Sequence, residues 1–429
     1  MKILIVNTFD NGGAANSCKR LHLGLLSKNI ESNVLLKSRQ NNWPNSFIYK
    51  FKLPAKWSST SDKIKNKIKR ILKELKLYDP KQVHKNENQK FLNRRPKGLE
   101  MFSFPNSGID ITQTDSYKEI DIINLHWVAN FLDYNSFFEK NIKPVVWTLH
   151  DMNPFSGGEH YEEKYLGIDN FGSPIRRQVS EEEKTVAKKN IKIKKQALSK
   201  VNNLTIVAPS EWLAEEARKS EVFKNYPVLC IPYGLDAEIY TPRDQDYSRD
   251  LLGIPKDKKV VLFVADSISN NRKGFVYLKR ALQQLSNKNV VLCAIGQKNS
   301  ELESMDNILE LGPIYDERLM SVAYSAADVF VIPSLMDNLP NTVLESIMCG
   351  TPVIGFPVGG IPEMIIDGKN GLLTKEISIN SFVETLTDFL DKPERFDKDE
   401  IRADALKKYD QKIQAERYIS LFKEINGQV

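Results

Sequence analysis

The chain has 429 residues, of which 41% are hydrophobic and 27% charged, and its formal net charge is +6. This composition is typical of a globular protein, and the length predicts two domains rather than one. The mild positive charge suits an acidic ligand or an anionic membrane surface. It is spread too thinly to indicate nucleic-acid binding, so we expect no nucleic acid as a partner.

The cysteine pattern and the apolar runs indicate in which cellular compartment the protein is expected. The chain begins with a short apolar run that Asn7 and Asp10 interrupt, so we expect no signal peptide. No run of about 18 apolar residues predicts a transmembrane helix. The cysteines are far apart, form no CxxC pair and favour reduced thiols over disulfides or zinc: Cys18, Cys230, Cys293 and Cys349. The sequence therefore predicts a cytoplasmic protein.

The first half alternates between strand and helix patterns. A strand pattern at residues 2–7 is followed by Gly12 and Gly13, a helical pattern at 14–26 and a second strand pattern at 33–38. Further strand patterns occupy residues 121–127, 144–151, 205–210 and 228–234, with helical spacers between most of them. Such alternation predicts a mostly parallel sheet that is covered on both faces.

The pattern starts afresh after a polar stretch at residues 241–250. New strand patterns occupy residues 258–266, 289–296, 308–314, 328–334, 352–359 and 371–374. We therefore predict an α/β protein with two doubly wound, Rossmann-like domains that face a cleft, one at 1–234 and the other at 235–409. A lone amphipathic helix at 410–429 could close either domain, including by crossing back to the first.

Residues 39–118 do not follow this rhythm. Within this insert, residues 62–78 place isoleucines and leucines on one helical face among many lysines. Two interpretations stay open for this helix. It binds anionic lipid headgroups, which would make the protein peripheral on the inner face of the plasma membrane, or it is a lysine-rich surface helix packed on its own domain.

The stretch DNLPNTVLE, residues 337–345, has an acid at each end. A buried strand pattern at 328–334 precedes it, Pro340 suits the first turn of a helix, and Gly350 ends that helix. Asp337 is therefore expected at the carboxyl end of a strand and Glu345 about one and a half turns into a helix. Open α/β sheets bind ligands at this edge, and a helix N-terminus favours phosphate. The arrangement suits a sugar nucleotide, with its diphosphate on the N–H groups of Asn338, Leu339 and Asn341.

The run from Pro333 to Leu373 closely resembles the donor-site signature of retaining glycosyltransferases of family 4, which have the GT-B fold. The segments GGAA, DIINLHW, PVVWTLHDMNPFSGGEHY and APSEWLAEEA also resemble the colanic-acid-biosynthesis-like branch of this family. The resemblance covers most of the chain except residues 39–100. It implies a nucleotide-sugar donor, a carbohydrate or lipid-linked acceptor, retention of anomeric configuration and a role in bacterial surface polysaccharide assembly.

Carried over residue by residue, the resemblance implies catalytic roles for His150, Lys273 and Asp337. The donor-binding residues that it implies are Gly13, Arg272, Lys273, Ile314, Asp337, Asn338, Leu339, Asn341 and Glu345. Two positions depart from the family pattern. Asp337 replaces the usual glutamate, and the family's Gly-Arg pair after the first strand of the second domain is Ala265-Asp266 here, for which Arg272 is a candidate substitute.

Other motifs are weaker. His126 suits either the site or a buried layer behind it, and His22 is expected only as a polar position on a helix. The aspartates at 244 and 246 are expected in a solvated turn, so we predict no metal site and no cofactor. The alternatives to a glycosyltransferase are a non-enzymatic two-domain sugar-binding protein and an NAD-dependent oxidoreductase. The second lacks the G-x-G-x-x-G spacing.

Overall fold

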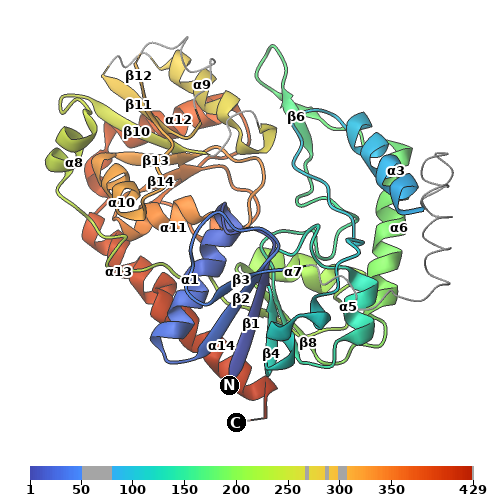
Figure 1. The fold of residues 1–429 in the computed structure, drawn as a ribbon. Helices are drawn as coiled ribbons and strands as arrows, with labels where there is room; N and C mark the ends of the chain where they lie inside the picture. Colours follow the sequence, from blue (N-terminus) through green and yellow to red (C-terminus); the bar gives the residue numbers. More distant parts are fainter. Residues whose placement is uncertain (51–79, 266–269, 286–288, 298–306, 428–429) are drawn as a thin grey trace, which may run out of the picture.

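The computed structural model describes residues 1–50, 80–265, 270–285, 289–297 and 307–427. Within these ranges the chain forms two lobes, each built on a parallel sheet with helices on both faces (Figure 1). The basic helix predicted at residues 62–78 lies outside the described residues.

The N-terminal lobe holds a seven-stranded sheet in the order β3-β2-β1-β4-β5-β8-β9, and every neighbouring pair is parallel. Its strands are β1 Lys2–Asn7, β2 Glu31–Leu36, β3 Ser46–Ile48, β4 Ile122–Leu125, β5 Val145–Thr148, β8 Leu204–Ala208 and β9 Val228–Cys230. The helical elements of this lobe are α1 Gly13–Ser27, α3 Pro80–Arg94, η1 Ile111–Gln113, α4 Asp115–Lys118, α5 Tyr134–Lys140, α6 Glu181–Leu198 and α7 Glu211–Lys219. A separate antiparallel hairpin, β6 Tyr165–Ile168 and β7 Pro174–Arg176, extends from this lobe.

The C-terminal lobe holds a six-stranded parallel sheet in the order β12-β11-β10-β13-β14-β15. Its strands are β10 Lys259–Val264, β11 Val290–Ile295, β12 Ile308–Gly312, β13 Val329–Ile332, β14 Val353–Gly355 and β15 Gly371–Leu373. The helical elements are α8 Gln245–Leu252, η2 Asn271–Lys273, α9 Phe275–Gln284, α10 Glu317–Ala326, α11 Asn341–Met348, η3 Ile361–Glu363, α12 Ile379–Asp391, η4 Pro393–Arg395 and α13 Lys398–Tyr409. In both lobes the strand order reverses beside the first strand, which is the doubly wound topology that the sequence predicts.

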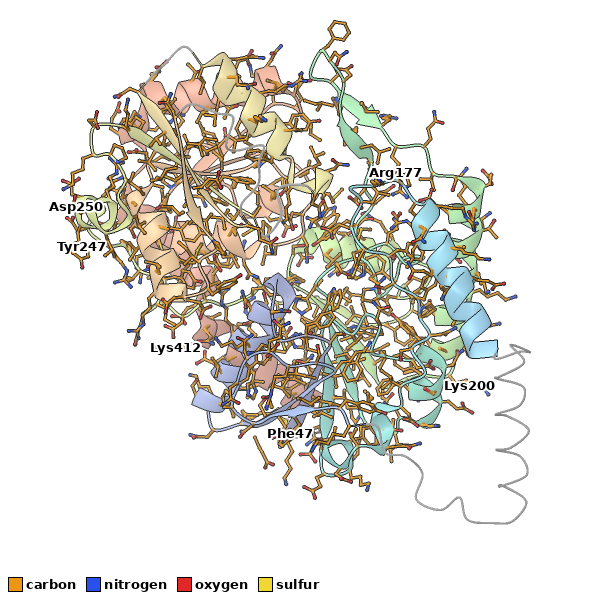
Figure 2. All side chains as sticks on the ribbon, turned by 45° about the horizontal axis from the view of Figure 1, so that its top comes forward. Phe47, Arg177, Lys200, Tyr247, Asp250 and Lys412 are labelled. Carbon is orange, nitrogen blue, oxygen red and sulfur yellow. The ribbon has the colours of Figure 1, made fainter. Side chains whose placement is uncertain are left out.

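Burial follows the residue patterns of the strands. The residues of β1 from Ile3 to Val6 are fully buried and alternate between two cores, because side chains of successive strand residues point to opposite faces. The four free cysteines are buried except for Cys230, which is partly exposed. Tyr247 and Asp250 of α8 are exposed, and Figure 2 shows them at the outer edge of the C-terminal lobe.

The last helix, α14 Gln411–Ile425, lies beside α1 in the N-terminal lobe (Figure 1). Its buried Tyr418 and Phe422 join the core formed by Ile3, Ile5 and Leu21. The chain therefore returns to its first lobe after completing the second one, which leaves the two lobes joined at more than one place.

Among the described residues, no helix is both long enough and apolar enough to span a bilayer.

Candidate active site

A cleft of about 410 Å³ lies where the carboxyl ends of the two sheets meet. The N-terminal lobe contributes Gly13, Ala14, Glu100, Trp127, His150, Asp151, Tyr161 and Tyr233. The C-terminal lobe contributes the end of β10, residues of η2, the end of β13, the loop that follows β13, and the start of α11. Since doubly wound sheets bind ligands outside their carboxyl ends, where the strand order reverses, this cleft is the expected position for a site.

Asp337 is at the centre of a charged cluster on the C-terminal wall of the cleft. Its Oδ2 accepts a hydrogen bond from Lys273 Nζ at 2.9 Å and lies 3.1 Å from Arg272 Nη1. Burial opposes ionisation of this carboxyl, but Lys273 and Arg272 outweigh burial and lower its pKa to about 2. Asp337 is therefore an anion at any working pH, and it draws both cations to one wall of the cleft.

Arg272 is almost fully buried and all three nitrogens of its guanidinium have protein partners. Nε donates to Glu100 Oε1 at 2.8 Å and Nη2 donates to the same oxygen, while Nη1 donates to the carbonyl of Met336 at 2.8 Å. The ring of Tyr161 lies 4.3 Å from the guanidinium carbon. Lys273, by contrast, keeps 31% of its side chain exposed, so Lys273 is the cation that an incoming anion reaches first.

Glu100 reaches this cluster from the N-terminal lobe, from within the insert at residues 39–118. Its carboxylate also accepts a hydrogen bond from Asn270 at 2.8 Å. Its backbone is held from both sides, because its N–H donates to Glu163 Oε2 and its carbonyl accepts from Arg95. Burial opposes its ionisation, but Arg272 outweighs that effect and lowers its pKa. Glu100 is therefore an anion of the N-terminal lobe that forms an ion pair with Arg272 of the C-terminal lobe.

Glu345 does not line the cleft. It is buried in α11, where Oε1 accepts from Arg20 Nη2 of α1 at 2.8 Å and Oε2 accepts from the Tyr324 hydroxyl at 3.0 Å. Arg20 also donates to Glu317 and to the hydroxyl of Tyr240. Burial raises the pKa of Glu345, and the nearby Arg20 offsets this only in part. In this structure Arg20 of the other lobe thus pairs with Glu345, the carboxylate that the sequence assigns to donor binding.

The loop before α11 is tied to the N-terminal lobe through its asparagines. Asn341 Nδ2 donates to the carbonyl of Gly13 at 2.9 Å, and Asn338 Nδ2 donates to the carbonyl of His150 at 3.3 Å. Leu339 is buried and lines the cleft between them. Pro340 is the N-cap of α11 rather than part of its first turn, since the helix begins at Asn341. These two hydrogen bonds join the lobes beside the N-terminus of α11.

His150 follows β5 and faces the cleft from the N-terminal lobe. Its Nε2 lies 2.9 Å from Nδ1 of His126, and its Nδ1 lies 2.7 Å from the hydroxyl of Tyr233. Burial lowers the pKa of His150 to about 4, with only partial opposition from Asp151. His126 is placed directly behind His150, away from the cleft lining.

The remaining sequence candidates lie elsewhere. Ile314 is partly buried outside the cleft lining, and His22 is buried in α1 against Ser32 and Pro44. Asp244 does not lie in a turn but caps α8, where it accepts from the N–H of Tyr247. In the part of the chain that the structure describes, no three His, Cys, Asp or Glu side chains gather as metal ligands would.

Sequence reasoning missed Glu100, Arg20 and Tyr233. Arg20 is on a helix whose buried face carries mostly apolar or small side chains, and an arginine on that face is a signal for a buried partner. Glu100 and Tyr233 carry no such signal, because each lies in an irregular segment whose course only the fold decides.

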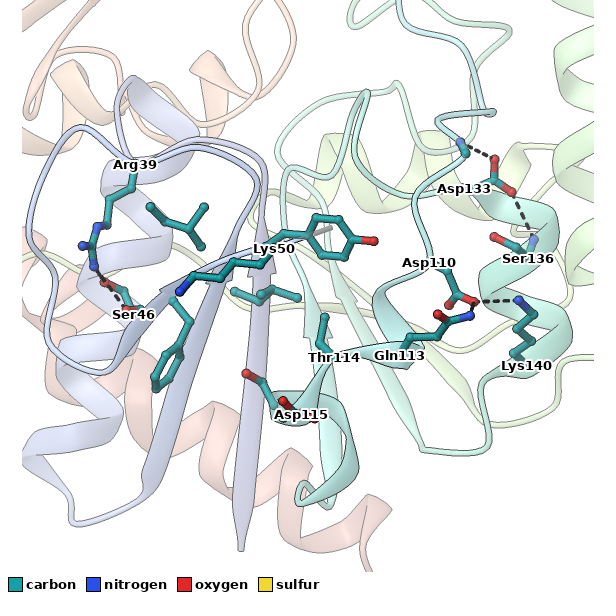
Figure 3. Close-up of a pocket in the computed structure, with 16 residues that line it drawn as sticks. Arg39, Ser46, Lys50, Asp110, Gln113, Thr114, Asp115, Asp133, Ser136 and Lys140 are labelled. Atoms are coloured by element: carbon teal, nitrogen blue, oxygen red, sulfur yellow. Dashed lines mark hydrogen bonds and ion pairs between the residues drawn. The ribbon is translucent and has the colours of Figure 1, made fainter. Parts of the chain in front are cut away.

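A larger concavity, of about 930 Å³, lies at the edge of the N-terminal sheet (Figure 3). It is lined by β3, by the segment that carries Asp110 and Gln113, and by Lys140 of α5, which pairs with Asp110. Phe47 at this edge is exposed (Figure 2). None of the residues of the Asp337 cluster lines this concavity, so the smaller cleft is the better candidate.

Comparison with known proteins relates the C-terminal lobe to one enzyme family and the whole chain to one fold. Residues 258–392 match the family model of glycosyl transferases group 1. A D-inositol 3-phosphate glycosyltransferase from Mycolicibacterium smegmatis is 31% identical over 172 residues, which is 37% of this chain and 39% of that protein. The chain thus matches about two fifths of the length of this curated relative.

Two solved structures match over nearly the whole length. A sucrose-phosphate synthase from Thermosynechococcus elongatus has a TM-score of 0.68 at 16% identity and covers 100% of both chains. The Anabaena protein HepE in complex with UDP-glucose has a TM-score of 0.63 at 16% identity, covering 99% of this chain and 100% of its own. The fold is therefore the GT-B fold of two Rossmann-like domains, and the segment 258–392 of the C-terminal lobe resembles a group 1 glycosyltransferase domain.

Proposed function

We propose that this protein is a retaining glycosyltransferase that moves a sugar from a nucleoside diphosphate donor to a hydroxyl acceptor. The observation that carries the proposal is the Lys273–Asp337–Arg272 cluster at the N-terminus of α11, opposite His150 in the cleft between two Rossmann-like lobes. Cations at a helix N-terminus suit a departing diphosphate. The group 1 match over residues 258–392 supports the same assignment.

In the proposed reaction Lys273 binds the diphosphate, because its ammonium is partly exposed and Asp337 fixes its position. As the sugar–oxygen bond breaks, negative charge grows on the diphosphate, and Lys273 and the α11 N-terminus stabilise that charge more strongly than in the ground state. The leaving oxygen takes the proton of the acceptor hydroxyl on the same face of the sugar. The two lobes hold the donor and the acceptor in a reactive orientation, and this orientation supplies the rest of the rate acceleration.

Asp337 is proposed to accept hydrogen bonds from sugar hydroxyls as well as to position Lys273. Its low pKa, about 2, keeps it an acceptor at neutral pH. It is not proposed as a nucleophile, since Oδ2 already faces Lys273, Arg272 and Ser334.

The acceptor is proposed to be a carbohydrate or a lipid-linked sugar in bacterial surface polysaccharide assembly, as the colanic-acid-like resemblance of the N-terminal segments implies. The curated relative is named for an inositol phosphate acceptor, but the matching part amounts to 37% of this chain. Inositol 3-phosphate is therefore a second acceptor to be assayed.

We also propose that the reaction needs no metal ion, and that residues 62–78 bind anionic lipid if the acceptor is membrane-borne.

The test is an assay of donor cleavage and transfer with UDP-, GDP- and ADP-sugars, with and without EDTA. We expect one nucleotide class to be turned over in EDTA, and Lys273→Met to lower kcat/KM roughly 100-fold with little change in stability. Lys375→Met, which removes an exposed lysine of the same lobe, is the matched control. Binding of free sugar without cleavage of any donor would instead indicate the non-enzymatic sugar-binding protein, and full dependence on Mn²⁺ or Mg²⁺ would refute metal independence.

A further inference from the structure

A chain of hydrogen bonds runs from the core of the N-terminal lobe to the cleft. It starts at Asn124 of β4, passes through His126 and His150, and ends at the hydroxyl of Tyr233. The three links measure 3.0, 2.9 and 2.7 Å. Asn124 and His126 are buried and absent from the cleft lining, so the proposed reaction leaves them without a role.

The direction of this chain follows from one backbone carbonyl. Asn124 Nδ2 lies 3.1 Å from the carbonyl oxygen of Val146, which can only accept, so the nitrogen of the amide must be on that side. Asn124 Oδ1 then faces His126 Nε2 and can only accept, so Nε2 of His126 carries a proton. The amide orientation of Asn124 thus determines the tautomer of His126.

The same reasoning continues to the cleft. A neutral His126 with a proton on Nε2 has an acceptor at Nδ1, so His150 must donate to it from Nε2. His150 then carries no proton on Nδ1, and this nitrogen accepts the hydroxyl proton of Tyr233. Each link in the chain therefore donates toward Asn124.

Burial keeps both rings neutral, as this reasoning requires. The pKa of His126 lies well below its usual range, first because of burial and then because of the neighbouring His150. The pKa of His150 is lowered to about 4, also mainly by burial. The titratable groups near this pair are Tyr233, Asp151 and Tyr161. The hydroxyl of Tyr161 lies 3.5 Å from the carbonyl oxygen of His150, and the carboxylate of Asp151 is hydrogen-bonded to His160 and Trp127.

We propose that Asn124 and His126 are positioning residues that hold His150 in its Nε2–H tautomer, so that His150 offers Nδ1 to the cleft as a hydrogen-bond acceptor. The geometry places the two ring nitrogens on different sides: His126 is behind the ring, whereas Tyr233, the partner of Nδ1, lines the cleft. This inference rests on the proposed function only for what binds there, which is a hydroxyl of the transferred sugar or of the acceptor.

Tyr233 acts as the stand-in for that hydroxyl. For a sugar hydroxyl to reach Nδ1, the side chain of Tyr233 must move aside, and the carbonyl of Leu149, at 3.5 Å, is a second acceptor for its hydroxyl proton. The site therefore selects a ligand group that can donate a proton. A deoxy sugar or a methyl ether at that position leaves Nδ1 without its partner and binds less well.

The experiment is ¹⁵N-histidine NMR of the full chain, in which the two ring nitrogens of a neutral imidazole are distinguished by whether they carry a proton. We expect His150 to be the Nε2–H tautomer at pH 7.5. In Asn124→Leu the anchor of His126 is gone, and we expect the Nδ1–H form of His150 to become populated. Thr148→Val removes a different neighbour of Asn124 and leaves the carbonyl of Val146 in place, so the tautomer should stay unchanged.

The kinetic arm uses the same variants. Asn124→Leu should lower kcat/KM three- to tenfold, the range that one neutral hydrogen bond produces, while Thr148→Val should not. If Asn124→Leu does not fold, His126→Phe gives the same comparison, since it removes the acceptor of Nε2–H. The inference is overturned by an Nδ1–H tautomer of His150 in the wild type. It is also overturned if the tautomer of His150 is unchanged in both Asn124→Leu and His126→Phe. These spectra can be read even if no donor is ever cleaved, so the failure of the proposed function is seen separately.

Discussion

Asp337 and Glu345 are eight positions apart in one motif, yet they differ in almost every physical respect. Asp337 lines the cleft, pairs with Lys273 and Arg272 of its own lobe and has a pKa lowered to about 2. Glu345 is withdrawn from the cleft, pairs with Arg20 of the other lobe and has a raised pKa. The difference teaches that one carboxylate lies in the cleft among cations of its own lobe, while the other joins the two lobes.

The largest effect is expected at Asp337. Asp337→Asn keeps the size of the side chain but removes the charge that positions Lys273, so kcat/KM should fall roughly 10²–10³-fold. The folded-state pKa lies below the unfolded value, so this group contributes stability above about pH 4 that is lost as the pH falls toward 2. Urea unfolding should therefore show the variant less stable than wild type at pH 7 and equal to it near pH 2. Normal activity in a folded variant would place the chemistry elsewhere.

Arg20 tests the other half of the comparison. Arg20→Met leaves Glu345 buried without its cation, which should destabilise the protein by about 3 kcal/mol in chemical denaturation at pH 7. Loss of Arg20 raises the pKa of Glu345 further, so the deficit should shrink as the pH falls and the carboxyl binds a proton. The control is the double variant Arg20→Met/Glu345→Gln, which should recover most of the loss. If the double variant is as unstable as the single one, the pair does not join the lobes.

Glu100 sharpens the comparison at the Asp337 end. Glu100, Asp337, Arg272 and Lys273 balance one another, so a diphosphate competes with Glu100 for Arg272. Glu100→Gln should therefore tighten the binding of the active nucleoside diphosphate by roughly tenfold in calorimetry. Glu162→Gln, an exposed glutamate nearby in the same lobe, is the matched control. Weaker binding in Glu100→Gln would show that Glu100 positions Arg272 rather than competing with the donor.

The smallest effect is expected at Glu163, which holds the backbone of Glu100. Its Oε1 is buried and has no hydrogen-bond partner among the residues that the structure describes, and burial raises the pKa of Glu163 to about 7. The folded-state pKa is above the unfolded one, so the stability that this group contributes is present below about pH 4.5 and is lost as the pH rises through 7. Glu163→Gln should be about 1 kcal/mol more stable than wild type at pH 8 and no more stable at pH 5. Parallel pH–stability curves for the two proteins would contradict this.

Much of the fold could be predicted from the sequence, because the signals are local. Buried parallel strands appear as continuous apolar runs such as residues 260–264, and Gly12 and Gly13 mark the first strand–helix turn. The spacing of Asp337 and Glu345 also placed them correctly at a strand end and on a helix. The hairpin β6–β7 was missed, since its two short strands carry no apolar alternation.

Partners of side chains were decided by the tertiary structure alone. Arg20 and Glu345 are 325 positions apart, and Glu100 and Arg272 are 172 apart, so no local pattern relates them. Whether a buried carboxylate is free for a ligand depends on which cation the fold brings beside it. In the same way, the proposed tautomer of His150 depends on the side-chain amide of Asn124, which is two hydrogen bonds away. The sequence by itself determined the sheets and the types of residue at the ends of their strands, because both follow from local periodicity. Only the packing of one lobe against the other decided which charged side chains meet, because Coulomb and hydrogen-bond energies depend on distances in space.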